Sequence, residues 1–198
     1  MCSERAFMTD QLLIESFMRG EQAAFNRLVY RWQKKIFLFA CRYTMNTHSA
    51  QDITQETFIR AYKGLPNLQN RERFGAWLYQ IALNLCKDRY KKKSPNLVSI
   101  QELTEKSDDG HMLPHELRQD AAENPDEQVR KAELMAHIQK ALNLLPEEQR
   151  IVVVMKQYQG LKFSEIADIL QEPLNTVKSR MYHGLAAIHK NLQSWQVI

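Results

Sequence analysis

Residues 163–192 read FSEIADILQEPLNTVKSRMYHGLAAIHKNL, and the spacing of their apolar residues decides how this part of the chain folds. Ser164 is placed to cap a first helix, which buries Ile166, Ala167 and Leu170. A short turn at residues 171–173 leads into a second helix whose apolar residues share one face, namely Val177, Met181, Leu185 and Ile188. Two helices joined by such a turn predict a helix-turn-helix.

The opposite face of the second helix is polar and basic where that helix begins. Lys and Arg side chains reach guanine acceptors or phosphates, and Ser, Thr and Asn contact either kind of group. We therefore expect the helix to enter the major groove of duplex DNA through Asn175, Thr176, Lys178, Ser179, Arg180, Tyr182 and His183. An ordinary helical hairpin with a solvated polar face is the alternative, because short helix-turn-helix patterns also arise by chance.

The N-terminal part of the chain has helical apolar spacing over four segments: Thr9–Met18, Glu21–Thr44, a segment that opens at Ser49 and closes at Gly64, and Phe74–Lys93. Ser49 is interpreted as an N-cap, with Asp52 as the acid of a capping box. The expected core residues are Leu12, Leu13, Phe17, Phe25, Leu28, Val29, Trp32, Ile36, Phe39, Ala40, Tyr43, Phe74, Trp77, Leu78, Ile81, Ala82 and Leu85.

The remaining segments complete an all-α prediction. Residues 94–130 are acidic and interrupted by prolines and Asp-Asp-Gly, which predicts a flexible linker. Further helices are expected at Asp126–Leu144, Pro146–Tyr158, Ser164–Leu170 and Pro173–Leu192. We therefore predict two small helical domains, an N-terminal helical bundle at residues 1–93 and a C-terminal helix-turn-helix domain at 131–198, joined by the linker.

Composition narrows the functional classes. Residues 1–93 carry a net charge of +8, residues 94–130 of −6 and residues 131–198 of +2, which together give the +4 of the chain. Two basic bodies suggest nucleic-acid binding, although basic surfaces also serve solubility alone. No apolar run approaches the roughly 18 residues of a membrane span, so we expect a cytoplasmic protein without membrane insertion. The three cysteines lack zinc-site spacing and no catalytic motif is visible, so we expect no metal, no cofactor and no enzyme activity.

Two sets of motifs resemble the extracytoplasmic-function (ECF) sigma factors of bacterial RNA polymerase. Residues 146–150 (PEEQR), 163–167 (FSEIA) and 176–180 (TVKSR) resemble region 4 of that family. Residues 52–58 (DITQETF) resemble region 2.2, and the Phe, Trp, Leu, Ile, Ala, Asn and Asp pattern of residues 74–88 resembles regions 2.3 and 2.4. The resemblance implies a sigma factor that binds core RNA polymerase and promoter DNA, directs promoter recognition, melting and transcription initiation for a stress or envelope regulon, and is monomeric when free. It also implies an anti-sigma factor as a partner.

One face of the helix after Ser49 is free of core residues. Asp52, Gln55, Glu56 and Ile59 recur there at helical spacing. Spacing alone favours a solvated face. The resemblance instead implies that this face docks on the clamp helices of the polymerase's largest subunit.

The loop before the last N-terminal helix, and one face of that helix, carry cations and amides suited to single-stranded DNA. The resemblance implies that these residues bind the melted minus-ten element and capture a flipped base: Asn67, Asn70, Arg71, Arg73, Gln80, Asn84, Lys87 and Lys91. Trp77 lies beside them, and its apolar register favours a core role over base stacking.

Two alternatives stay open on the residues alone: a dimeric helix-turn-helix regulator with a helical sensor domain, and an adaptor that binds no DNA. Residues 182–185 also depart from the resemblance, because the family often has further arginines there. Fewer cations predict fewer phosphate contacts. Gly184 is expected to cost the helix about 1 kcal/mol relative to Ala.

Overall fold

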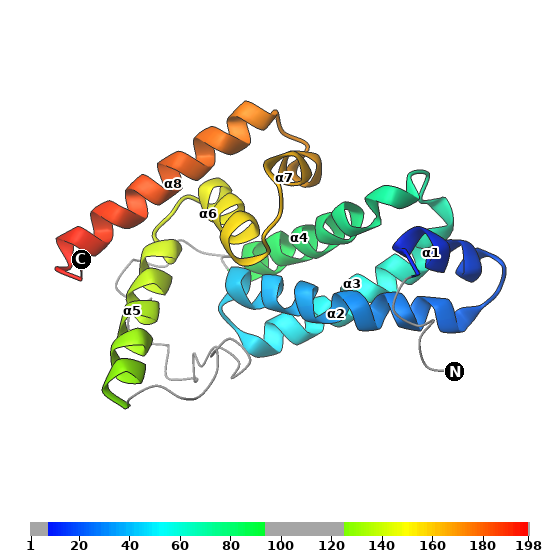
Figure 1. The fold of residues 1–198 in the computed structure, drawn as a ribbon, viewed down its shortest axis with the longest axis horizontal. Coiled ribbons are helices and arrows are strands. Elements are labelled where there is room, and N and C mark those ends of the chain that lie inside the picture. Colours follow the sequence, from blue (N-terminus) through cyan, green and yellow to red (C-terminus); the bar gives the residue numbers. More distant parts are fainter. Residues whose placement is uncertain (1–7, 94–124, 198) are drawn as a thin grey trace. The chain divides into compact units, whose positions relative to one another are not determined.

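The computed structural model describes residues 8–93 and 125–197, and all regular secondary structure in these two ranges is helical. The all-α prediction is confirmed. The chain divides into two compact units, with α1 to α4 in the first and α5 to α8 in the second (Figure 1). Residues 94–124, most of the expected linker, lie outside the described residues. Helix α5 begins at Pro125, which agrees with the helix predicted at Asp126–Leu144 and makes the overlapping end of the predicted linker helical.

The first unit contains the four expected helices: α1 (Asp10–Met18), α2 (Gln22–Thr44), α3 (Thr47–Gly64) and α4 (Phe74–Lys93). Two short 3₁₀ turns, Leu65–Asn67 and Arg71–Arg73, connect α3 to α4. The long helix α2 is central, since it packs against α1, α3 and α4. This arrangement leaves one side of α3 and one side of α4 free of helical neighbours within the unit.

Aromatic side chains hold α4 against α2. The rings of Phe39 and Tyr79 meet edge to face with centroids 5.5 Å apart, and Trp32 meets Phe74 at 6.1 Å. A methyl group at Gly75 would lie 2.4 Å from the Trp32 ring, so α4 approaches α2 this closely only because residue 75 has no side chain. These contacts fix the position of the helix that carries Gln80 and Asn84.

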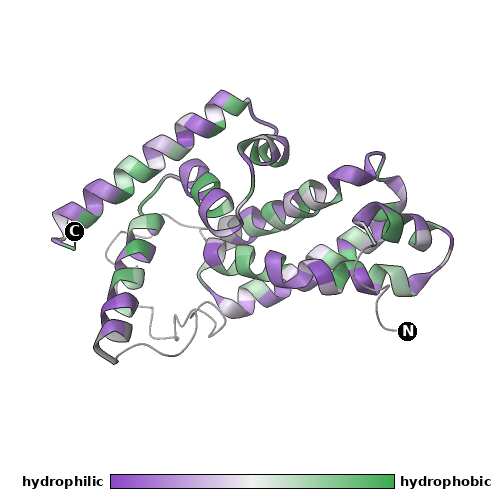
Figure 2. Cartoon of the chain, viewed as in Figure 1, coloured by the Kyte–Doolittle hydropathy of each residue, from purple (hydrophilic) through white to green (hydrophobic). Residues whose placement is uncertain are grey.

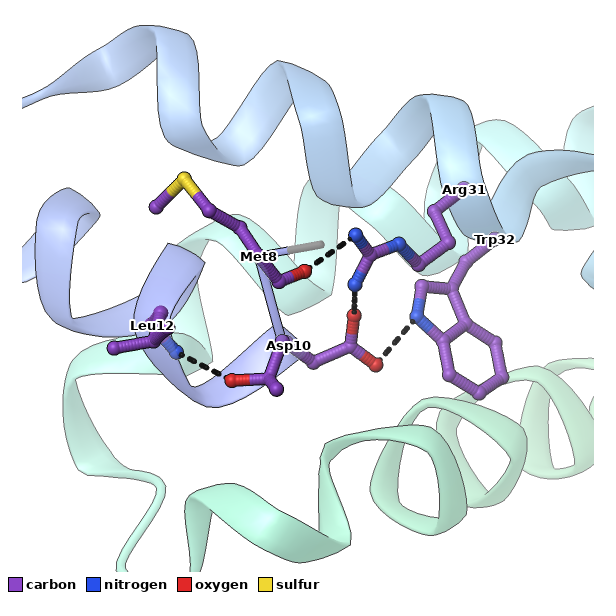
Figure 3. Close-up of polar contacts among 6 residues, drawn as sticks. Met8, Asp10, Leu12, Arg31 and Trp32 are labelled. Carbon is purple, nitrogen blue, oxygen red and sulfur yellow. Dashed lines mark hydrogen bonds and ion pairs between the residues drawn. The ribbon is translucent and has the colours of Figure 1, made fainter. Parts of the chain in front are cut away.

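A small polar cluster joins α1 to α2 (Figure 3). The Asp10 carboxylate accepts hydrogen bonds from Arg31 Nη1 at 2.5 Å and from Trp32 Nε1 at 3.0 Å. Arg31 Nη2 also donates to the carbonyl oxygen of Met8 at 2.6 Å. The Thr9 hydroxyl caps α1 by accepting from the backbone N–H of Leu12. The start of this helix is therefore held both by its own cap and by the contacts of Asp10 with α2.

Two local predictions for the first unit are wrong. Asn46, not Ser49, caps α3, because its side-chain oxygen accepts from the Ser49 backbone N–H at 2.7 Å. Ser49 and Asp52 therefore lie inside the helix, and the Ser49 side chain is buried. The core faces are also rotated slightly: Leu12 is exposed and Ile14 is buried instead. Other residues expected in the core are only half-buried, namely Phe17, Val29, Trp32, Trp77, Ile81 and Leu85.

The second unit contains α5 (Pro125–Asn143), α6 (Glu147–Val153), a π-helical turn (Val154–Tyr158), α7 (Phe163–Leu170) and α8 (Leu174–Ser194). Helix α8 packs against α5, α6 and α7. After the π-helical turn the chain reverses at Gly160, whose φ of +65° is the left-handed conformation that glycine adopts easily. Gly160 thus allows the chain to leave this helical segment.

Hydrophilic and hydrophobic residues share every helix of both units (Figure 2). None of the helices formed by residues 8–93 and 125–197 is long and apolar enough to cross a membrane.

Candidate polymerase and nucleic-acid interfaces

One side of α3 presents an exposed apolar residue among polar ones. Ile59 is 49% exposed, Gln55 is exposed, and Asp52 and Glu56 are half-exposed. The opposite side of α3 is in the core, where Ile53, Thr57 and Ala61 are buried. The structure therefore brings the four predicted residues together on one accessible face, which we call the α3 face.

Ion pairs orient both carboxylates of the α3 face. Asp52 pairs with Arg89 of α4 at 2.5 Å, and Glu56 pairs with Arg60 one turn along α3 at 2.8 Å. Such half-exposed pairs contribute little to stability, about 0.2–1 kcal/mol each. Their main effect is to place a guanidinium beside each acid, so the α3 face offers both signs of charge to a partner.

Tyr62 extends this face by one turn, although the predicted polymerase-binding residues did not include it. Its ring packs edge-on against Phe17 and Phe25, with centroids 5.3 Å and 5.1 Å away, yet Tyr62 stays 45% exposed. The i, i+3 spacing from Ile59 was the signal that placed it beside the free face.

The loop between α3 and α4 is held in a defined shape. The Asn70 side chain accepts from the backbone N–H of Glu72 at 3.1 Å, which caps the second 3₁₀ turn. Arg71 lies 3.6 Å from Glu15 of α1, so this loop is tied to α1. Asn67 and Arg73 are exposed. The structure therefore gives Asn70 and Arg71 roles in shaping the loop, which the sequence did not indicate.

Helix α4 continues the polar surface. Asn84 is exposed, and Gln80 and Lys87 are half-buried on the same side of the helix. Lys91 is part of α4, but its side chain lies outside the described residues. Trp77 packs over Gly64, where an added methyl group would lie 3.0 Å from its ring, and the side chain is half-exposed. The Trp77 side chain is thus neither fully buried in the core nor fully exposed to solvent.

The helix-turn-helix is formed by α7, a turn at residues 171–173, and α8. Gln171 ends α7 in the left-handed conformation, with a φ of +54°. The apolar contact between the two helices comes from Ile166, Ile169, Val177 and Met181, which are all buried. The predicted Ser164 cap is wrong, since α7 begins one residue earlier and the Glu165 carboxylate accepts from the backbone N–H of Lys162 at 2.6 Å.

The outer side of α8 is accessible at its N-terminal end. Tyr182 is 68% exposed and Thr176 is half-buried, while the other accessible residues of this side are Asn175, Lys178, Ser179 and His183. Leu185 is exposed rather than buried as predicted, because α8 meets α6 at Gly184 instead. We call Asn175, Lys178, Ser179 and Tyr182, which share one side, the α8 face.

Arg180 is different from its neighbours on α8. Its guanidinium lies 2.7 Å from Glu148 of α6 and 3.1 Å from Glu172 of the turn, and its side chain is only 20% exposed. The guanidinium that was predicted to contact DNA thus pairs with two carboxylates of the protein itself.

Both halves of the chain match family models. Sigma-70 region 2 matches residues 28–95, and Sigma-70 region 4 matches residues 136–188. The ECF RNA polymerase sigma factor SigW of Bacillus subtilis is 35% identical over 180 residues, which cover 91% of this chain and 95% of SigW. The chain belongs to the ECF sigma factors.

Other relatives agree with this assignment. The sigma-H factor of Pseudomonas aeruginosa is 33% identical over 93% of this sigma factor and 94% of its own length. The ECF sigma-E factor of Escherichia coli is 31% identical over 94% of this chain and 95% of its own length. In the solved complex of CnrH with the cytosolic domain of CnrY, a chain shares the fold with a TM-score of 0.67 at 22% identity, over 93% of this chain and 97% of that one.

As a sigma factor, the protein binds core RNA polymerase and directs it to promoter DNA. The alternative of a dimeric regulator required the first unit to be a sensor domain. That alternative is set aside, because the first unit matches Sigma-70 region 2.

Proposed function

We propose that the two units of this sigma factor divide promoter recognition between three surfaces. The α3 face holds the polymerase, the loop and outer side of α4 bind the melted minus-ten strand, and the α8 face reads the duplex minus-thirty-five element. The observation that carries the proposal is the half-exposed Ile59 surrounded by Asp52, Gln55 and Glu56. An apolar centre with a polar rim is typical of a protein interface.

The minus-ten surface combines groups that suit an unpaired strand. Arg73 and Lys87 supply cations for phosphates, and Asn67 and Asn84 supply amides that can pair with base edges. The tie between Arg71 and Glu15 supports a preformed loop, so less ordering is required when a base enters it. Gln80 and Lys91 extend this proposed surface along α4.

Regulation by a protein partner belongs to the same proposal. Two structural neighbours were solved with partners, CnrH with the cytosolic domain of CnrY and RpoE with the anti-sigma factor NepR. We propose that this sigma factor is likewise held by an anti-sigma factor, acts in the cytoplasm as an initiation subunit without enzyme activity of its own, is monomeric when free, and serves a stress or envelope regulon.

Reconstituted transcription tests the central proposal. The full chain is mixed with core polymerase and supplied with fragments of genomic DNA, and the transcripts are sequenced to locate their promoters. We expect a subset of fragments to be transcribed only when the chain is present. Stable binding of the free chain to duplex DNA, without any complex with polymerase, would contradict the proposal.

Glu56→Lys tests the polymerase contact. The substitution reverses one charge on the α3 face and breaks the pair with Arg60, so we expect core polymerase affinity to fall at least about 30-fold, as for a buried interfacial charge that loses its partner. Affinity is measured by fluorescence titration of core polymerase with labelled chain. Glu21→Lys is the control for charge reversal alone, because Glu21 is exposed just before α2 and is not part of α3. Equal affinities for the two variants would remove Glu56 from the interface.

A further inference from the structure

We infer that Arg180 is a positioning residue, which holds the recognition helix α8 in place through Glu148 and Glu172 and does not itself read DNA. The inference rests on the proposed role of the α8 face in minus-thirty-five recognition. It assigns different roles to Lys178 and Arg180, two cations that lie two positions apart on one helix.

The Arg180 guanidinium connects three elements of the second unit. Glu148 lies in the first turn of α6, Glu172 lies in the turn of the helix-turn-helix, and Arg180 lies in α8. The same nitrogen, Nη2, is 2.7 Å from Glu148 Oε2 and 3.1 Å from Glu172 Oε1. Arginine suits this task because its planar guanidinium presents several donors to more than one carboxylate.

The two ion pairs of Arg180 differ in how far their carboxylates are exposed to solvent. The Glu172 side chain is 34% exposed, whereas that of Glu148 is 70% exposed and therefore more strongly screened by solvent. We thus expect the bond to Glu172 to be the stronger one. It fixes the turn against α8, which sets the direction in which α8 leaves the turn and enters the groove.

The direction of the side chain agrees with this role. Successive residues of a helix are rotated by about 100°, so Arg180 lies between the exposed Ser179 and the buried Met181. To reach a phosphate or a base, its guanidinium has to leave both carboxylates. Those acids would then stand uncompensated beside polyanionic DNA, which is unfavourable. Arg180 in its observed place offsets one of their two negative charges.

The inference is tested by asking whether the effect of Glu172→Gln on promoter binding changes sign when Arg180 is removed. The probe is a fluorescent duplex fragment of the strongest promoter found in the transcription experiment, titrated with holoenzyme. If Arg180 positions α8, Glu172→Gln should weaken binding about fivefold. The substitution removes one partly exposed ion pair, and such a pair changes an equilibrium constant by somewhat less than tenfold. In the Arg180→Ala background the same Glu172→Gln should strengthen binding, because only a repulsive acid is removed. If Arg180 reads DNA, Glu172→Gln strengthens binding in both backgrounds, which would overturn the inference.

Lys178→Ala serves as the comparison for a direct DNA contact. Its loss should reduce the slope of log affinity against log salt by about 0.9, the value for one phosphate contact, while Arg180→Ala with Glu172→Gln should leave the slope nearly unchanged. Equal losses of slope would count against the positioning role. Arg180→Lys should restore part of the binding lost in Arg180→Ala, since one ammonium can hold one of the two acids.

A measurement without DNA keeps the inference separate from the proposed function. Thermal unfolding of the full chain is compared for Arg180→Ala, Glu172→Gln and the double variant. Non-additive shifts in Tm are expected, because the single variants break the same bond. Additive shifts would overturn the inference even if promoter binding behaves as proposed. If instead Lys178→Ala leaves promoter binding intact, the α8 face fails and the Tm coupling still decides the role of Arg180.

Discussion

At the residue scale, the buried thiols of the first unit are chemically quiet. Cys41 and Cys86 are both buried in the helical core. Burial raises the pKa of Cys86 to about 12. Burial also raises the pKa of Cys41 to about 11, partly offset by the adjacent Arg42 guanidinium. Because the thiolate is the reactive form, neither side chain is suited to redox sensing or metal binding at neutral pH.

The raised pKa of Cys86 predicts a loss of stability at alkaline pH. The folded chain holds the thiol neutral, so its contribution is complete below the ordinary thiol pKa of about 8.5 and is lost as the pH rises toward the folded value of about 12. The loss approaches about 1.4 kcal/mol per pH unit within that window. Thermal unfolding between pH 7.5 and 10.5 measures it.

Cys86→Ala is the control for that effect. It lacks the Cys86 thiol but keeps the buried Cys41, so its Tm should still fall at alkaline pH, but less steeply than that of the unaltered chain. Parallel curves for the two proteins would show that Cys86 does not ionise more easily on unfolding.

At the element scale, helices were easier to predict than the residues that end them. The periodicity of α2 predicted its full length to within one residue, because a long amphipathic stripe leaves few alternatives. The start of α3 was placed wrongly, since Asn46 and Ser49 are both good caps and lie three residues apart. The choice is fixed by Met45, which ends α2 in the left-handed conformation and makes Asn46 the first residue able to cap α3.

Gly184 shows a second effect that periodicity does not reveal. In an exposed helix, Ala at this position would be favoured by about 1 kcal/mol. Here a methyl group would lie 2.9 Å from Val153 Cγ2 of α6, so the glycine permits the close approach of α6 and α8. The unfavourable local propensity is offset by packing.

Gly184→Ala should therefore destabilise the second unit, by roughly 1–3 kcal/mol as in other overpacked cores, and lower the Tm of the full chain. Combining it with Val153→Ala makes room for the added methyl group. The double variant is expected to be more stable than the sum of the two single changes implies. If Gly184→Ala raises Tm by itself, the helices are not in close contact at this point.

At the scale of the whole molecule, we propose that the polymerase contact on α3 and the minus-thirty-five contact on α8 belong to separate units. Ile59→Asp should lower core polymerase affinity at least tenfold with little change in Tm, because Ile59 is half-exposed and contributes mainly to the interface. Lys178→Ala should leave core affinity unchanged and weaken promoter binding. Ile53→Asp places the same charge on the core side of α3 and should unfold the first unit. It is the control that shows how core affinity and Tm change when the first unit misfolds.

The opposite pattern would contradict this division of labour. If Lys178→Ala weakened core binding as much as Ile59→Asp does, the second unit would hold polymerase as well. Titration of core polymerase with each labelled variant distinguishes the two cases.

Apolar periodicity was enough to predict the helices of both units, and motif order was enough to predict their family. They were not enough to predict which cations are free. Arg71, Arg89 and Arg180 pair with acids on other elements, and Asp52 and Arg89 are 37 positions apart. Such pairs depend on how helices pack, and neither periodicity nor motif spacing contains that information. The candidate sites predicted from spacing and from the family resemblance therefore included arginines that pair with acids of the protein itself.

The π-helical turn at Val154–Tyr158 has a consequence for changes in chain length. A π-helical turn contains more residues than the α-helical turn that covers a similar stretch of axis, so it is the form that a one-residue insertion takes within an α-helix. A deletion there can be absorbed by tightening to an α-helix, and the helix-turn-helix downstream keeps its register. A deletion within α8 would instead rotate all later side chains by about 100°. We therefore expect the segment before α7 to tolerate a one-residue deletion that the recognition helix cannot.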